Sequence, residues 1–277
     1  MRSLFKKIFS DTFRRIQSEH LEFISSAKNQ KFNLKILFIA VIACISLSCI
    51  EYIGKDDGYY LIIEFLKNHG FAVLSDRIRF FIEHETNHQL FSLGYWVFII
   101  LIFYILLPVL LIKIVFKEKI SDYGFTIGNL FKDYKIYLLF FGFMIPVIII
   151  FSTTQSFQNR YPFYRMYGNE TLWPNFWTWQ LLYFFQFIAV EFFFRGFLVH
   201  GFKKQFGYYS VLIMTIPYCM IHFGKPFPET MAAILAGIIL GTLSLKSRTI
   251  WMGVMIHYTV ALSMDLSALW QRGYWFH

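Results

Sequence analysis

The sequence has few charged residues for its length. Charged side chains make up 16% of its 277 residues, whereas hydrophobic side chains make up 57% and aromatic ones 21%. Because soluble domains usually carry about 25% charged residues, this scarcity excludes an ordinary soluble domain and indicates an integral membrane protein. The net charge of +9 is explained by basic residues at the cytoplasmic ends of membrane spans, so no nucleic-acid partner is indicated.

Cysteine is also scarce, and its placement excludes a covalent framework. The three cysteines, Cys44, Cys49 and Cys219, lie in apolar runs without a CxxC spacing. Neither a disulfide framework nor a thiolate zinc site is therefore expected. The GxSxG pattern of serine hydrolases and the GxxxxGK[ST] pattern of phosphate-binding loops are also missing from the sequence, so neither chemistry is indicated.

Long apolar runs make up most of the sequence. Each is near the length of about 20 residues that crosses a bilayer, although the third, fifth and sixth are short. The predicted fold class is therefore all-α, a polytopic transmembrane helix bundle of about seven spans. The polar segment 54–92 carries an amphipathic pattern that predicts interfacial helices outside the bilayer. The seven runs lie at 34–53, 95–116, 136–152, 174–199, 208–222, 230–246 and 249–270.

The first 34 residues form a segment of their own, which is basic and amphipathic. Apolar residues alternate with lysine and arginine, the pattern of a helix lying on an anionic leaflet, so membrane lipids are an expected partner. Residues 35–277 are predicted to form a single transmembrane bundle. Lysine and arginine concentrate in the N-terminal segment and in alternate connections, which predicts a cytosolic N-terminus and an external C-terminus.

Ionisable residues interrupt three of the late apolar runs. Glu191 is followed four residues later by Arg195, and His222 and His257 lie in later runs. The spacing places Glu191 and Arg195 on one face of a helix, within pairing distance. A structural ion pair with histidines that only pack would give the same pattern. Because each such group costs free energy to insert into a membrane, we expect the three sites to face one another in a shared interior cavity.

A carboxylate with two histidines suits two hydrolytic chemistries. His222 and His257 can bind a divalent metal such as zinc with a water in the open position, or Glu191 can act as general base on a water held by the histidines. Intramembrane acids and histidines also mark the proton or ion path of a transporter, which is a further interpretation. The paired halves that would support transport are not visible in the sequence.

The order of these residues resembles the motifs of the CPBP family, the CAAX-protease and bacteriocin-processing intramembrane proteases related to the type II CAAX prenyl endopeptidase. The resemblance rests on Glu191 and Arg195 followed by Gly-Phe-Leu, on Tyr218 four residues before His222, and on His257 in the last run, and it covers about 117–269. It implies a glutamate that activates water, histidines that hold the water or a metal, and an arginine that fixes the glutamate. The implied reaction is cleavage of a peptide bond in a membrane-associated or lipid-anchored substrate. The family's breadth favours a bacterial plasma (inner) membrane.

Two positions depart from the family's motifs. The glutamate usually assigned as general base aligns with Val190, and the usual asparagine of the third motif aligns with Ala261. A catalytically silent membrane scaffold or immunity-type protein is therefore the main alternative to an endopeptidase.

Other carboxylates in the sequence offer a replacement for the missing base. We hypothesise that Glu229 or Asp265 supplies it, although Glu229 can instead charge the start of a helix and Asp265 can lie at the outer interface. Tyr218 and Lys225 are further candidates for the site.

Overall fold

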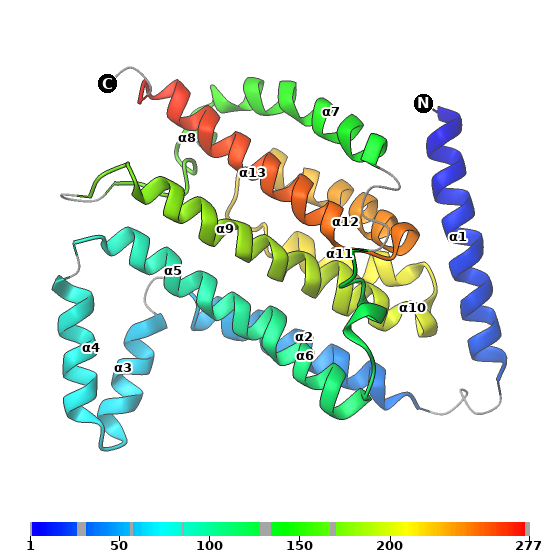
Figure 1. The fold of residues 1–277 in the computed structure, drawn as a ribbon, viewed down its shortest axis with the longest axis horizontal. Helices are drawn as coiled ribbons and strands as arrows, with labels where there is room; N and C mark the ends of the chain where they lie inside the picture. The colour runs from blue at the N-terminus through cyan, green and yellow to red at the C-terminus, as the bar shows by residue number, and fades with distance from the viewer. Residues whose placement is uncertain are drawn as a thin grey trace.

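The computed structural model describes residues 2–26, 32–55, 58–84, 86–127, 134–166 and 170–274, with side chains from residue 9 onward. In these segments every regular element is a helix (Figure 1), as the composition predicts. Six of the described helices are long and apolar enough to cross a membrane. They are α2 (Leu34–Tyr52), His88–Phe116, α7 (Tyr134–Ser152), Asn175–Phe206, α12 (Phe227–Ser247) and α13 (Trp251–Gln271). The chain is an integral membrane protein with the fold of a polytopic helix bundle.

Two of the long helices consist of several segments. His88–Phe116 comprises α5 (His88–Leu101), η2 (Ile102–Leu106), α6 (Leu107–Leu110) and η3 (Leu111–Phe116). Asn175–Phe206 comprises α9 (Asn175–Glu191), η5 (Phe192–His200) and α10 (Gly201–Phe206). The segments η2, η3 and η5 are π-helical, a rare geometry that often occurs at functional sites. The segment η5 begins directly after Glu191.

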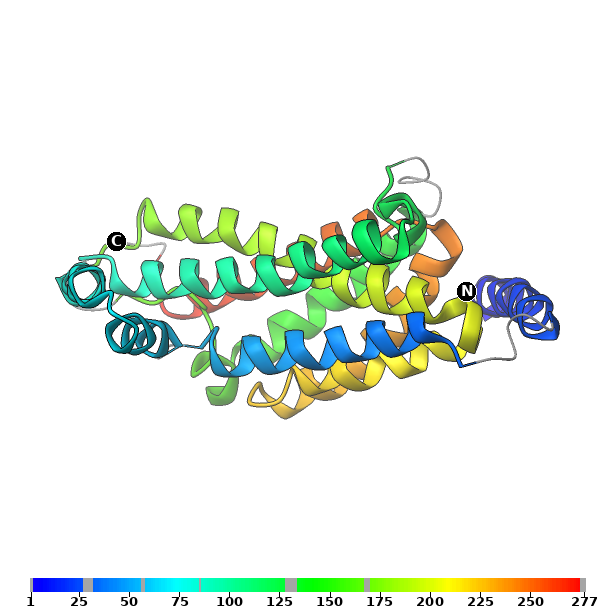
Figure 2. The same cartoon turned by 90° about the horizontal axis from the view of Figure 1, so that it is seen from below.

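The fifth apolar run forms a helix that is shorter than a full span. The helix α11 (Tyr209–Met220) has 12 residues, which gives a length of about 18 Å against a hydrocarbon core of about 30 Å. It ends before the turn that carries His222. Figure 2 shows this yellow-to-orange turn, between α11 and α12, well short of the far end of the bundle. Of the seven predicted spans, six form helices of full length in the described residues, and the fifth forms a short one.

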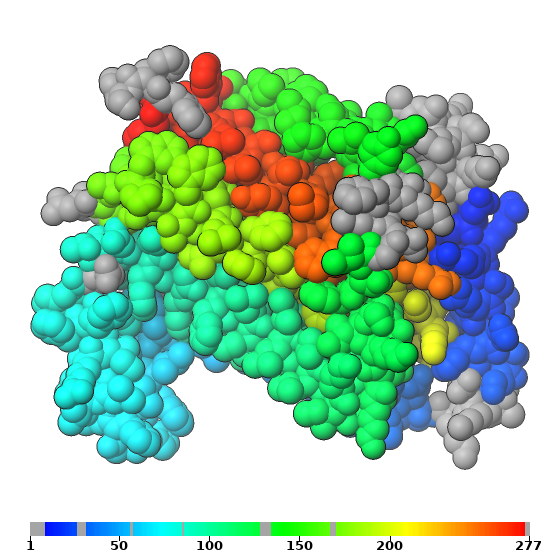
Figure 3. Space-filling model, in the orientation of Figure 1, coloured from blue at the N-terminus to red at the C-terminus, as the bar shows by residue number. Residues whose placement is uncertain are grey.

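Shorter helices cover the two ends of the bundle. At one end α1 (Arg2–Ser25) lies across the spans (Figures 1 and 2), the orientation of an interfacial helix. At the other end α3 (Gly58–Asn68) and α4 (Ala72–His84) form a hairpin that protrudes at a corner of the molecule (Figure 3). The remaining helices, η4 (Ile120–Tyr123) and α8 (Gln155–Gln158), are short. The two chain ends lie at opposite ends of the bundle (Figure 1), and the assignment of either end to the cytosol stays a prediction.

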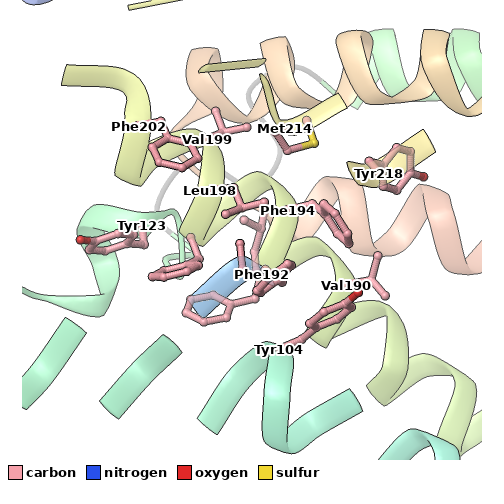
Figure 4. Close-up of a cluster of buried hydrophobic side chains, with 14 of the residues drawn as sticks. Tyr104, Tyr123, Val190, Phe192, Phe194, Leu198, Val199, Phe202, Met214 and Tyr218 are labelled. Atoms are coloured by element: carbon pink, nitrogen blue, oxygen red, sulfur yellow. The ribbon is translucent and has the colours of Figure 1, made fainter. Parts of the chain in front are cut away.

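Aromatic packing fixes the segment η5 in the middle of the bundle (Figure 4). The phenylalanines at 192–194 have no solvent exposure, and Tyr104 of η2 stacks on Phe193 with ring centroids 4.1 Å apart. Gly196 allows the η4 segment to approach closely, because a Cβ atom there would lie 2.7 Å from the carbonyl oxygen of Tyr123. The helix that carries Glu191 and Arg195 is thus held on several sides, which favours a rigid position for both.

Candidate active site

Glu191 and Arg195 form an ion pair in the interior of the bundle. Nη1 of Arg195 lies 3.0 Å from Oε1 of Glu191, and both side chains have 0% solvent exposure. The guanidinium also lies over the ring of Tyr218, 3.9 Å from its centroid, where the negative face of the ring attracts a cation. Within the described residues none of the guanidinium nitrogens has a hydrogen bond of good geometry. Glu191 and the Tyr218 ring therefore supply most of the electrostatic stabilisation of the buried Arg195 guanidinium.

His257 contacts the same oxygen of Glu191. Its Nδ1 lies 3.0 Å from Oε1, and because a carboxylate only accepts hydrogen bonds, Nδ1 carries the proton and donates. The other ring nitrogen, Nε2, then bears the lone pair, and the hydroxyl of Tyr218 lies 3.5 Å from it. Phe187 packs on the imidazole with ring centroids 4.4 Å apart. Glu191 thereby fixes both the tautomer and the orientation of His257.

Gly253 allows the Glu191 carboxylate to reach the backbone of α13. A Cβ atom at this position would lie 2.4 Å from Oε2 and 3.1 Å from the carboxyl carbon of Glu191. Gly253 precedes His257 by four residues, so the two share one face of α13. Sequence reasoning missed Gly253, although its spacing from His257 is the signal that marks it.

Replacing Gly253 by alanine is expected to push Glu191 out of place. An extra methyl group in a packed interior costs about 1–3 kcal/mol, and we expect a loss of stability of that size in detergent-micelle unfolding. Gly142→Ala on α7 is the matched control, because a Cβ atom there meets nothing within 4 Å and alanine favours a helix. Equal unfolding midpoints for Gly253→Ala and the unaltered protein would contradict this account.

His222 reaches the site through Tyr218. Its Nδ1 lies 2.8 Å from the backbone carbonyl oxygen of Tyr218, and because a carbonyl only accepts, Nδ1 carries the proton. The rings of His222 and Tyr218 meet edge to face at 4.8 Å, and the ring of His257 is 6.2 Å from the same tyrosine ring. The structure therefore groups Glu191, Arg195 and both histidines around Tyr218.

Glu229 has partners outside this group. It accepts hydrogen bonds from the hydroxyl of Tyr161 at 2.8 and 2.9 Å and from Nζ of Lys225 at 2.7 Å. Burial, followed by the neighbouring Glu229, raises the pKa of Tyr161 well above its usual value, so the hydroxyl keeps the proton that it donates. Glu229 also lies in the first turn of α12, where a carboxylate is favoured by the helix dipole.

Asp265 is fully buried. Its oxygens accept hydrogen bonds from the backbone N–H of Phe163 at 2.9 Å, from Nε2 of Gln180 at 2.8 Å and from Nε1 of Trp179 at 3.3 Å. Like Glu229, it therefore anchors the loop between α8 and α9 to the bundle. Neither carboxylate contacts Glu191 or a site histidine within the described residues, so the structure favours anchoring over replacement of the missing base.

The two positions that depart from the family motifs are buried and apolar. Val190 is 5% exposed and belongs to the cluster around η5 (Figure 4). Ala261 is also 5% exposed and packs in a second cluster with Trp179 and Tyr183. Both side chains therefore contribute to hydrophobic packing in the bundle.

Both site histidines direct Nδ1 to an acceptor and leave Nε2 as the nitrogen that could accept a proton or bind a metal. In the part of the chain that the structure describes, no three His, Cys, Asp or Glu side chains are grouped closely enough to hold a metal ion. Nδ1 of His257 faces Glu191, and Nδ1 of His222 faces a carbonyl oxygen. A zinc ion held by His222 and His257 would need a third ligand that these residues do not provide.

One segment of the chain matches a known protein family. Residues 171–263 match the family model of the type II CAAX prenyl endopeptidase Rce1-like proteins. Over this segment the chain is similar to the CPBP family. The matched segment contains all of η5, α11 and α12 and every residue of the site, from Glu191 to His257. The resemblance seen in the motifs is confirmed over this range, about a third of the chain. No curated protein and no solved structure matches the chain.

Proposed function

We propose that the chain is an intramembrane endopeptidase that hydrolyses a peptide bond in a membrane-associated or lipid-anchored substrate. The observation that carries this proposal is the buried chain of contacts from Arg195 through Glu191 to His257, with 3.0 Å on each side of one carboxylate oxygen. Such an arrangement orients an imidazole and stabilises its protonated form. The match to CAAX prenyl endopeptidases supports a lipid-anchored peptide as the substrate class.

Glu191 is better placed to orient His257 than to act as the base itself. Its Oε1 is engaged by Arg195 and His257, its Oε2 packs against Gly253, and the side chain has no solvent exposure. The side chain of His257 is 18% exposed, so the imidazole is the more accessible of the two groups. We therefore assign the general base to Nε2 of His257 and the stabilisation of the resulting imidazolium to Glu191.

The proposed reaction needs water and protein groups. Nε2 of His257 takes a proton from water while the water oxygen bonds to the carbonyl carbon of the peptide. The hydroxyl of Tyr218, 3.5 Å from Nε2, donates a hydrogen bond to the oxyanion that forms. The imidazolium then gives its proton to the amide nitrogen, the carbon–nitrogen bond breaks, and an acid and an amine are released.

Cleavage in a reconstituted membrane tests this function. The purified chain in liposomes is mixed with a farnesylated peptide that ends in a CAAX sequence and carries a fluorophore and a quencher on either side of the expected bond. We expect fluorescence to rise and mass spectrometry to find a single cleaved bond. If neither this peptide nor acylated and transmembrane peptides are cleaved, the endopeptidase proposal is wrong.

Removing one hydroxyl tests the role of Tyr218. For Tyr218→Phe we expect kcat to fall by about 10²–10³-fold, the usual cost of losing one oxyanion donor. KM and thermal stability should change little, because the ring under Arg195 remains. Tyr208→Phe is the matched control, because its hydroxyl lies 2.7 Å from the hydroxyl of Thr242. This contact is in the last part of α12, away from the group around Tyr218. An unchanged kcat for Tyr218→Phe would remove Tyr218 from the mechanism.

A catalytically silent membrane scaffold is the second candidate function. The apolar burial of Val190 and Ala261 favours it, because family members usually carry polar groups there. This candidate predicts that no peptide is cleaved, and that a His257→Gln protein behaves in cells like the unaltered protein. The liposome assay and a cellular comparison of these two proteins separate the candidates.

A further inference from the structure

The helix α1 is attached to the bundle by specific polar contacts. Nη2 of Arg15 donates a hydrogen bond to the carbonyl oxygen of Leu245 at 2.6 Å, in the last turn of α12. A ring nitrogen of His20 lies 3.1 Å from the carbonyl oxygen of Lys204, and Ile16 is buried with 2% exposure. Figures 1 and 2 show α1 across the end of the bundle at this junction. Its position is therefore set by the protein as well as by a membrane surface.

The packing at this junction leaves little freedom for α1 to shift. A Cβ atom at Gly207 would lie 2.8 Å from Oε1 of Gln17, so the turn after α10 touches α1 directly. The rings of Phe13 and Tyr208 meet edge to face with centroids 5.6 Å apart. Side chains on α1 consequently hold fixed positions relative to those on α10 and α12.

Basic side chains gather where α1 meets the bundle. Lys203 lies within electrostatic range of Arg15, Lys204 and Arg248, and Glu19 is the carboxylate of this cluster. Four cations against one carboxylate leave a formal charge of +3. Like charges held this close repel one another, so an added anion would stabilise the arrangement.

The two arginines of this cluster lie too far from its carboxylate for a hydrogen bond to it. Oε1 of Glu19 lies 3.9 Å from Nε of Arg15 and 3.8 Å from Nη2 of Arg248, which is longer than a hydrogen bond. Nε of Arg15 is buried, and within the described residues it has no hydrogen-bond acceptor. A buried donor without an acceptor is costly. The missing acceptor is of the kind that a phosphate oxygen provides, since guanidinium groups match phosphate geometry.

We propose that Arg15, Lys203 and Arg248, with Lys204 beside them, form a binding site for the phosphate of an anionic phospholipid headgroup. A lipid is favoured over free phosphate because α1 lies across the end of the transmembrane helices, the level at which headgroups lie. Cations near an anionic leaflet also attract its lipids individually. The site lies outside the group around Tyr218 and does not depend on the proposed peptidase function.

Lipid binding by the whole protein tests this site. The purified chain is delipidated in detergent, and phosphatidylglycerol, phosphatidylcholine or inorganic phosphate is then added separately. We expect phosphatidylglycerol to stay bound in native mass spectrometry and to raise Tm, and the other two additives to do neither. Equal protection by inorganic phosphate would show an ion site instead of a lipid site, and equal binding of phosphatidylcholine would exclude recognition of an anionic headgroup.

Charge-removing variants locate the binding. The double variant Lys203→Gln and Arg248→Gln should weaken phosphatidylglycerol binding by about fivefold for each cation removed. Arg248→Gln alone should keep the fold, because this side chain is 64% exposed. It should weaken phosphatidylglycerol binding by the roughly fivefold expected for one cation. The control is Arg77→Gln with Arg79→Gln on α4, at the other end of the bundle. Unchanged binding by the double variant, or equal weakening by the control, would overturn the proposed site.

Discussion

Exchanging His257 for glutamine is expected to abolish peptide cleavage, with kcat falling by about 10²–10⁴-fold, the usual contribution of a general base. Glutamine can still donate a hydrogen bond to Glu191, but it has no basic nitrogen to take a proton from water. KM should change much less than kcat, because binding of the lipid anchor does not involve the imidazole. The rate is measured with the farnesylated fluorogenic peptide at saturating concentration.

The control for this exchange is His84→Gln. His84 is exposed on α4, and its contacts within the described residues are to Phe80 of the same helix, so its replacement should leave kcat and Tm unchanged. Both proteins are compared in thermal unfolding to confirm that they fold. Cleavage by the His257→Gln protein at the rate of the unaltered chain would exclude His257 as the base.

The second large effect is on stability. Replacing Arg195 by leucine is expected to lower the free energy of unfolding by about 3–5 kcal/mol, because Glu191 then stays as a buried charge without its cation. Both side chains are inaccessible to solvent, so water cannot take over the role of the partner. Denaturant titration in mixed micelles, followed by tryptophan fluorescence, measures the loss.

A double variant distinguishes this explanation from a simple packing defect. Adding Glu191→Gln to Arg195→Leu removes the uncompensated charge, so it should recover much of the lost stability. A packing defect would instead give losses that add. If the double variant is as unstable as the sum of the two single variants, the ion pair is not the source of the effect.

The sequence predicts the local geometry of the site better than its distant contacts. The pairing of Glu191 with Arg195 follows from a spacing of four residues on one helix, and the structure has it at 3.0 Å. The approach of His257 to Glu191 follows from the cost of isolated charges in a membrane. Both arguments apply general physical rules to residues that can be read from a single sequence.

Other features depend on contacts that periodicity does not report. Tyr161 and Gln180 donate hydrogen bonds to Glu229 and Asp265 from 68 and 85 positions away in the chain, so sequence spacing does not reveal these contacts. Hydropathy marks the fifth run as apolar without showing that its helix ends after 12 residues. Local helix propensity also gives no signal for the π-helical form of η5.

Under the proposed peptidase function, the position of His257 along α13 sets a length for the substrate. His257 lies six residues after Trp251, where α13 begins, so its ring is about 9 Å below the end of that helix. An extended peptide covers about 3.3–3.6 Å per residue. A chain that enters from the α1 end therefore needs about three extended residues to bring its carbonyl to Nε2. In the proposed reaction, the cleaved bond is therefore selected by its distance from the membrane surface.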